Sequence, residues 1–212
     1  MAKDKKRVTS KRPKVKSKAK SRTVMKKAHT KISIKMPVMK GNVTSSNLLV
    51  TFDPAHSGRA VLEIQSLLKE VKMNAEFVAQ EEGLFLLKAS NPKEIVKKLK
   101  VLCEKSPKKF NSTFHYIPID TWASSNIKTM QTITKKLGEK IGKTEKWKMN
   151  LNKRHYEVDS RELIVKLTDP IDRQFVDLKN PDKIVQVEII GKNAGISLLS
   201  KNELLEVSKI KG

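Results

Sequence analysis

Eight basic side chains in the C-terminal half of the chain have the chemistry needed to bind a polyanion. A guanidinium can grip a phosphate through two hydrogen bonds or stack on an unpaired base, whereas an ammonium acts as a point charge. Arg154 is therefore the strongest single candidate, and the ring of His155 could stack similarly. The alternative, that each is one more solvated cation among 45 Lys and Arg, stays open. The candidate set is Lys148, Lys153, Arg154, His155, Arg161, Lys179, Lys183 and Lys192.

A strand and the helix after it must position the first candidates. Residues 147–151 alternate between apolar and polar side chains, which indicates a half-buried strand with Lys148 on its wet face. Lys153 and Arg154 are expected in the gap that follows this strand. Arg161 opens the next helix, where the free N–H groups of the first turn also favour phosphate.

The stretch 175–199, which reads FVDLKNPDKIVQVEIIGKNAGISLL, predicts a turn and a hairpin that carry the other candidates. Lys179 and Lys183 flank the Asn-Pro-Asp turn, in which proline presets φ. The VQVEI run then alternates as a strand does, and the GKNAG segment, with Lys192 at its tip, turns the chain back. This alternation directs Glu188 to solvent or to a neighbouring lysine.

The chain before these residues predicts a ferredoxin-like domain. Strand-like apolar runs occur at 48–52, 77–79, 84–87 and 114–117. Apolar stripes at helical spacing follow the first and the third of these runs, and Asn-Pro-Lys-Glu at 91–94 has the pattern of a helix start. The resulting order βαββαβ places two helices on one face of a four-stranded antiparallel sheet.

The second half predicts the order helix, strand, helix and hairpin. Residues 120–122 are expected to form a joint between the two halves. Ser124 or Ser125 would then cap a long amphipathic helix. Residues 202–208 predict a short terminal helix.

Positive charge is concentrated at the N-terminus but not confined to it. Of the 212 residues, 45 are Lys or Arg and 22 are Asp or Glu, a net charge of +23. Residues 1–42 hold 16 basic residues and one acid, so they carry +15, and the remaining 29 basic and 21 acidic residues carry +8. Residues 1–46 therefore predict a disordered basic tail, which is either a phosphate-binding arm or a solubilising tail. Nucleic acid is the expected partner, rather than a membrane.

Other classes of protein find little support in the sequence. No apolar run approaches the length of a transmembrane helix, and the N-terminus lacks the apolar centre of a secretory signal. The single cysteine, Cys103, rules out an intrachain disulfide, suits a reducing compartment and lies on a helical stripe expected in the core. Neither a phosphate loop nor a metal-binding histidine spacing occurs. We therefore expect no catalytic residue, no metal and no cofactor.

The ordered pattern VDL-x-NPD, V-x-VEI-x-G and GIS between residues 176 and 197 resembles the THUMP domain, an RNA-binding module of tRNA-modifying enzymes. The resemblance implies a THUMP-like α/β domain at 121–205, preceded by the ferredoxin-like domain at 47–120. The fold class is then α+β, with the basic tail in front. It also implies that several of the eight candidates share one RNA-binding face.

The segment WKMNLNKRHYEVDSRELI at 147–164 is similar to the strand–KRH–helix segment of a THUMP-only family, the stand-alone tRNA-binding adapters of tRNA cytidine acetyltransferase. Since the sequence ends at Gly212, no fused catalytic domain is expected. The resemblance implies a noncatalytic cytoplasmic adapter that presents tRNA to a separate acetyltransferase for 4-acetylcytidine formation. Two alternatives stay open: a structural or ribosome-associated RNA-binding protein, and the RNA-binding subunit of another split tRNA-modifying enzyme.

Overall fold

The computed structural model describes residue 39, residues 41–81 and residues 83–212. The predicted tail, residues 1–46, falls mostly outside these described residues, so its disorder stays a prediction. The last part of that range is described. Val43–Ser45 form a 3-10 turn, capped by the side chain of Asn42, which accepts a hydrogen bond from the Ser45 N–H.

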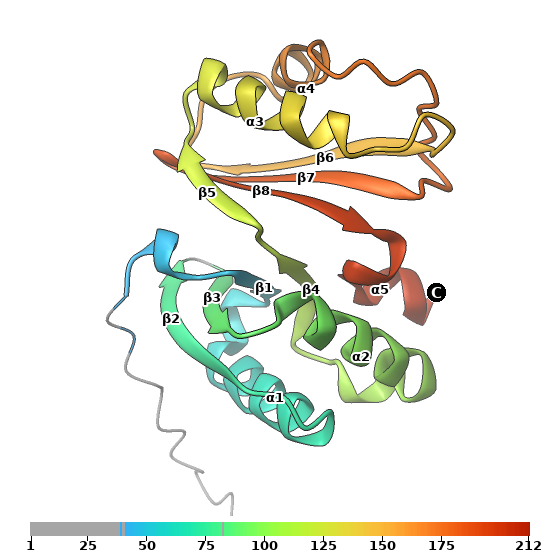
Figure 1. The fold of residues 1–212 in the computed structure, drawn as a ribbon. Coiled ribbons are helices and arrows are strands. Elements are labelled where there is room, and N and C mark those ends of the chain that lie inside the picture. The colour runs from blue at the N-terminus through green and yellow to red at the C-terminus, as the bar shows by residue number, and fades with distance from the viewer. Residues whose placement is uncertain (1–38, 40, 82) are drawn as a thin grey trace, which may run out of the picture. The chain divides into compact units, whose positions relative to one another are not determined.

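An antiparallel sheet with two helices on one face forms the first half of the described chain (Figure 1). Its elements are β1 (Leu48–Phe52), α1 (Ser57–Glu70), β2 (Ala75–Glu81), β3 (Leu84–Ala89), α2 (Pro92–Lys105) and β4 (Thr113–Pro118). The α+β fold class and the βαββαβ order predicted from periodicity are confirmed. Asn91 caps α2 by accepting the Glu94 N–H at 3.2 Å, and Pro92 begins the helix without losing a hydrogen bond.

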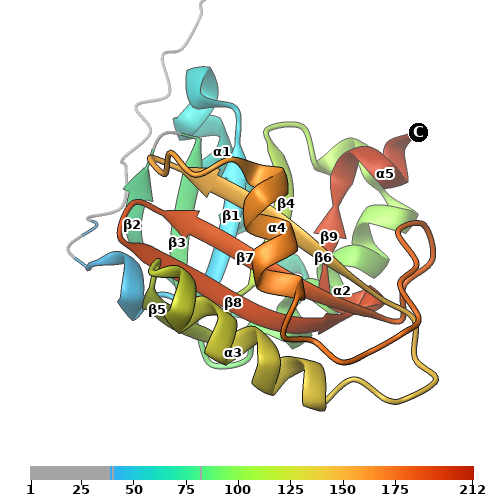
Figure 2. The ribbon, with the colours of Figure 1, turned by 90° about the horizontal axis from the view of Figure 1, so that it is seen from above.

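The second sheet has the strand order β5-β8-β7-β6, with β6 parallel to β7 and the other pairs antiparallel. Its elements are β5 (Thr121–Ser124), α3 (Ile127–Glu139), β6 (Trp147–Arg154), α4 (Ser160–Thr168), β7 (Lys183–Ile190) and β8 (Asn193–Ser200). Figure 2 shows α3 and α4 lying over one face of this sheet. Buried side chains such as Met130 and Leu163 on the helices pack there against Val185 and Val187.

Two local predictions for this half were wrong. Residues 121–124 are a strand that pairs with β8, not a joint. Residue 195 is glycine where β8 passes Trp122 of β5: a Cβ there would lie 3.0 Å from a ring carbon of Trp122, a tighter contact than most side chains make. The cap of α3 is Asn126, whose side chain accepts the Lys128 N–H, and neither Ser124 nor Ser125 fills that role.

The C-terminal residues return to the first sheet. A 3-10 turn (Lys201–Glu203) leads to β9 (Leu205–Glu206), which pairs with β4, and then to α5 (Val207–Lys211). The helix predicted at 202–208 is therefore wrong in position. Leu205 of β9, the fifth strand of the first sheet, and Val207 at the start of α5 are both buried in the core of that sheet.

The two sheets, which belong to one compact unit, also pack on each other through the faces that their own helices leave open. Leu49, Leu86 and Ile117 of the first sheet share a buried cluster with Ile184 and Leu199 of the second. Burying each such side chain stabilises the fold by roughly 1.5–3 kcal/mol. The face of the second sheet that lies away from α3 and α4 is thus partly a sheet–sheet interface, not an open wet surface.

Candidate nucleic-acid interface

Strand β6 is an edge strand whose two faces have different surroundings. Trp147 and Met149 are buried beneath α3 and α4. The alternate positions, Lys148, Asn150, Asn152 and Arg154, lie on the face turned toward the first sheet. The sequence predicted this alternation but ended the strand too early: β6 continues through Lys153 and Arg154, which pair with Ile189 and Ile190 of β7. The expectation that both lie in a gap after the strand is wrong.

A cleft of about 910 Å³ lies between this face of β6 and the first sheet. Its walls come from β6 and β7 on one side and from β1, β4 and β9 on the other. Polar side chains from both sheets line it: Thr51, His115, Asn150, Asn152, Arg154, Gln186, Glu188 and Glu206. The cleft therefore holds the hydrogen-bonding groups that a polar ligand needs.

A chain of side-chain hydrogen bonds crosses from β6 to β7 inside the cleft. Asn150 donates to Gln186 at 3.1 Å. Gln186 and Asn152 each donate to the same oxygen of Glu188, Oε1, at 2.6 Å. Glu188 is only 1% exposed, so the prediction that it points to solvent or to a lysine is wrong. Because burial disfavours the carboxylate form, it raises the pKa of Glu188, against the lowering effect of its two amide donors and Arg154.

Arg154 lies in the cleft at the end of this series of hydrogen-bonded side chains. Its guanidinium lies 3.9 Å from Glu188 Oε2, and its side chain keeps 29% of its surface exposed. The partner is Glu188, not Asp159 or Glu162 nearby in sequence, because β6 runs beside β7 in parallel. Arg154 is thus held by a buried carboxylate while part of its guanidinium remains available to a ligand.

His155 and Lys153 flank this arginine in different ways. His155 is exposed and has a positive φ of 54°, a conformation in which the chain turns sharply out of the strand. The Lys153 ammonium donates to the Tyr156 carbonyl at 3.1 Å, which holds it over the loop. Both line the cleft with Arg154, so three of the predicted residues meet at one end of it.

A second cavity, of about 230 Å³, lies at the start of β6 and is hereafter the lysine pocket. It is lined by the lysines Lys100, Lys148, Lys179, Lys201 and Lys209, with a single acid, Glu206. They come from α2, β6, the Asn-Pro-Asp loop, the 3-10 turn and α5, so both halves of the chain contribute. Glu206 also lines the cleft, which makes the two cavities neighbours.

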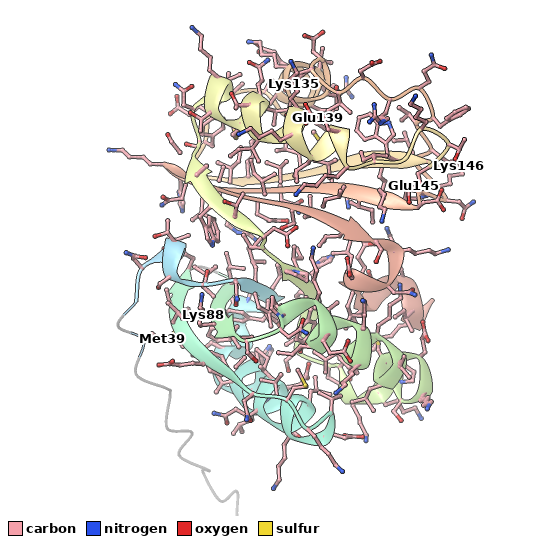
Figure 3. All side chains as sticks on the ribbon, viewed as in Figure 1. Met39, Lys88, Lys135, Glu139, Glu145 and Lys146 are labelled. Atoms are coloured by element: carbon pink, nitrogen blue, oxygen red, sulfur yellow. The ribbon has the colours of Figure 1, made fainter. Side chains whose placement is uncertain are left out.

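The remaining predicted residues lie apart from both cavities. Arg161 is exposed at the start of α4, but the first-turn N–H groups there already donate to the Asp159 carboxylate, which lowers its pKa. Lys183 is half-buried and lies 3.7 Å from Glu145. Lys192 is exposed at the hairpin tip. By contrast, Lys135 on α3 is exposed and points away from both sheets (Figure 3).

Sequence reasoning missed three lysines of the pocket, Lys100, Lys201 and Lys209, and the cleft residue His115. Nothing in local spacing connects them, because they meet only when β9 and α5 return to the first sheet. His115 accepts or donates a hydrogen bond with Thr51 at 2.8 Å, and burial lowers its pKa. These residues are of ordinary types, and the sequence did not predict them because they lie far apart along the chain.

Two classes of feature are missing from the part of the chain that the structure describes. Among residues 39, 41–81 and 83–212, no group of three or more His, Cys, Asp or Glu side chains could hold a metal ion. No helix in the same residues is long and apolar enough to cross a membrane.

The segment that forms most of the second sheet and its two helices matches a known protein family. Residues 124–199 match the family model of the THUMP domain. This segment is a THUMP domain. The match contains α3, β6, α4, β7 and all but the last residue of β8, so the resemblance carried by the VDL, NPD and GIS motifs is confirmed. A search of curated proteins found no match to the chain.

Solved structures resemble this chain at low sequence identity. PH1313 from Pyrococcus horikoshii OT3 is 16% identical with a TM-score of 0.54, covering 76% of this chain and 55% of that one. TrmN from Thermus thermophilus is 14% identical with a TM-score of 0.46, covering 71% and 44%. A 4-thiouridine synthetase in complex with RNA and bound ATP is 15% identical with a TM-score of 0.41, covering 76% and 42%. The chain thus spans about half the length of these chains, and the likeness to PH1313 is one of fold.

Proposed function

We propose that this protein is a noncatalytic tRNA-binding adapter that presents tRNA to a separate cytidine acetyltransferase for 4-acetylcytidine formation. The observation that carries the proposal is the THUMP domain at 124–199, whose edge strand holds cations at both ends of one face. Lys148 begins that face at the lysine pocket, and Arg154 ends it at the cleft.

Charge and geometry along β6 support RNA as the ligand. Lys148 and Arg154 are six residues apart in a strand, so roughly 20 Å of backbone separates them. Lysines attract phosphates along such a path through a salt-dependent field, and amide side chains between them can hydrogen-bond bases. Asn150 and Asn152 occupy those middle positions and line the cleft. Phosphate contacts at the ends and polar contacts between them suit a nucleic-acid strand better than a small apolar ligand.

The noncatalytic part of the proposal rests on what the perturbed groups already do. Strongly shifted pKa values often mark catalytic sites. Here Glu188 accepts two amide donors, Asp159 caps α4, and Asp177 accepts the Lys179 and Asn180 N–H groups of the Asn-Pro-Asp turn. Cys103 is buried in the core, and burial raises the pKa of its thiol, which makes it a poor nucleophile. The pKa shifts of these four groups therefore follow from burial and from hydrogen bonds within the fold.

The acetyltransferase partner is supported by the similarity of segment 147–164 to the THUMP-only adapters. In the structure this segment is β6, the turn at His155 and the start of α4, which together form the wall of the cleft and its exit. We also propose a cytoplasmic location, in keeping with a single buried free cysteine.

Analysis of modified nucleosides in tRNA from cells lacking this protein tests the proposal. We expect 4-acetylcytidine to disappear and to return when the wild-type gene is restored. Loss of a different modified nucleoside would replace the acetyltransferase by another partner enzyme. An unchanged nucleoside profile, with the protein bound to ribosomal particles, would contradict the adapter role.

A further inference from the structure

The lysine pocket crowds like charges into a small space. Its five lysines face one glutamate, and that glutamate lies 2.6 Å from the Lys209 ammonium. Ammonium groups at this density repel one another, so the pocket is at its most favourable when an anion occupies it. This repulsion is relieved by an occupant of opposite charge, not by Glu206 alone.

Lys100 shows that the pocket is more than a set of freely solvated side chains. It is half-buried on α2, and its ammonium donates to the Lys201 carbonyl at 2.7 Å, which fixes its position. Burial lowers the pKa of Lys100, and the Lys201 charge adds to this, against the opposite effect of Glu104 and Glu206. An anion beside it would favour the charged ammonium and so raise the pKa again. The apolar side chains of Pro181, Ile184 and Leu204 complete the wall.

We infer that the lysine pocket binds the terminal phosphate of an RNA strand, a phosphate monoester. This inference rests on the proposed RNA-binding function. A monoester carries about 1.5 to 2 negative charges at neutral pH and three free acceptor oxygens, whereas an internal phosphodiester carries one charge and two such oxygens. Five lysines from five segments match the group with more charge and more acceptors. The pocket also adjoins the cleft through Glu206 and Leu204, so the strand would continue along β6.

Two RNA strands of one sequence, one with a 5′-phosphate and one with a 5′-hydroxyl, test the inference in binding titrations with the full chain. The wild-type protein should prefer the phosphorylated strand by about tenfold, the scale of one charge-assisted contact. Lys100→Gln and, separately, the exposed Lys201→Gln should abolish the preference between the two strands. Lys135→Gln on the outer face of α3 is the matched control and should keep the preference.

Equal affinity of the wild-type protein for both strands would overturn the inference, and so would a preference that survives in both pocket variants. A second measurement separates this failure from failure of RNA binding itself. Titration with a nucleoside 5′-monophosphate, followed by NMR of the lysine side chains, should shift the Lys100 signal in the wild-type protein. An unshifted signal at saturating nucleotide would overturn the pocket's assignment whether or not RNA binds.

Discussion

The ion pair of Arg154 with Glu188 differs from the other ion pairs in the described part of the chain, because its carboxylate is almost fully buried. Replacing Arg154 by Ala removes the cation and leaves that carboxylate with its two amide donors alone. Breaking a fully buried pair costs about 3–5 kcal/mol. Here the separation is 3.9 Å and 29% of the arginine side chain is exposed, so we expect a loss of about 1–2 kcal/mol in the free energy of unfolding at neutral pH.

A double-mutant cycle identifies the cause of that loss. Glu188→Gln keeps the shape and an acceptor for Asn152 and Gln186 but removes the buried charge. In the Glu188→Gln background, Arg154→Ala should therefore cost under about 0.5 kcal/mol, the range of ordinary surface substitutions. Urea unfolding of the four proteins at neutral pH gives the coupling energy. If Arg154→Ala costs the same in both backgrounds, the ion pair does not hold the arginine, and the cleft geometry described above is wrong.

Three further outcomes are expected. Because burial raises the pKa of Glu188 above 4.5, wild-type stability should fall as pH rises from about 4.5 through the higher folded-state pKa, and urea unfolding of Glu188→Gln should lack that component. Deleting residues 1–38 should flatten the salt dependence of RNA binding and keep the thermal transition; an unaltered salt slope argues against a phosphate-binding arm. The purified chain alone should not transfer acetyl groups from acetyl-CoA to tRNA, and turnover above background would refute the adapter role.

The sequence predicted the elements whose side chains repeat with a clear period. Alternation in the VQVEI run located β7, and helical stripes located α1 and α2, because burial of one face leaves a periodic pattern in the chain. The Asn-Pro-Asp turn and the motifs around it were specific enough to identify the THUMP domain. All of these features are determined by residues that lie close together in the sequence.

What the sequence did not predict depends on packing between distant segments. A polar residue such as Glu188 alternates like a solvent-facing one, and only the first sheet across the cleft makes it buried. Strand β9 has two residues, too few to show a period, yet it brings Lys201 and Lys209 to the lysine pocket. The end of β6 was misplaced because Lys153 and Arg154 look like loop residues until β7 pairs with them in parallel.

The salt dependence of tRNA binding tests the central claim, that tRNA binds along β6 of the THUMP domain. The comparison uses protein that lacks residues 1–38, after its thermal transition has been shown to be intact. Three forms of this protein are compared: one without further changes, one with Lys148→Gln and Lys179→Gln, and one with Lys135→Gln and Lys136→Gln. The first pair lines the lysine pocket, whereas the second is exposed on α3. We predict that losing the first pair reduces the log–log salt slope by at least about 0.7–0.9, the one phosphate that the pocket holds, and that losing the second leaves the slope unchanged. Equal slopes for both pairs would contradict the claim.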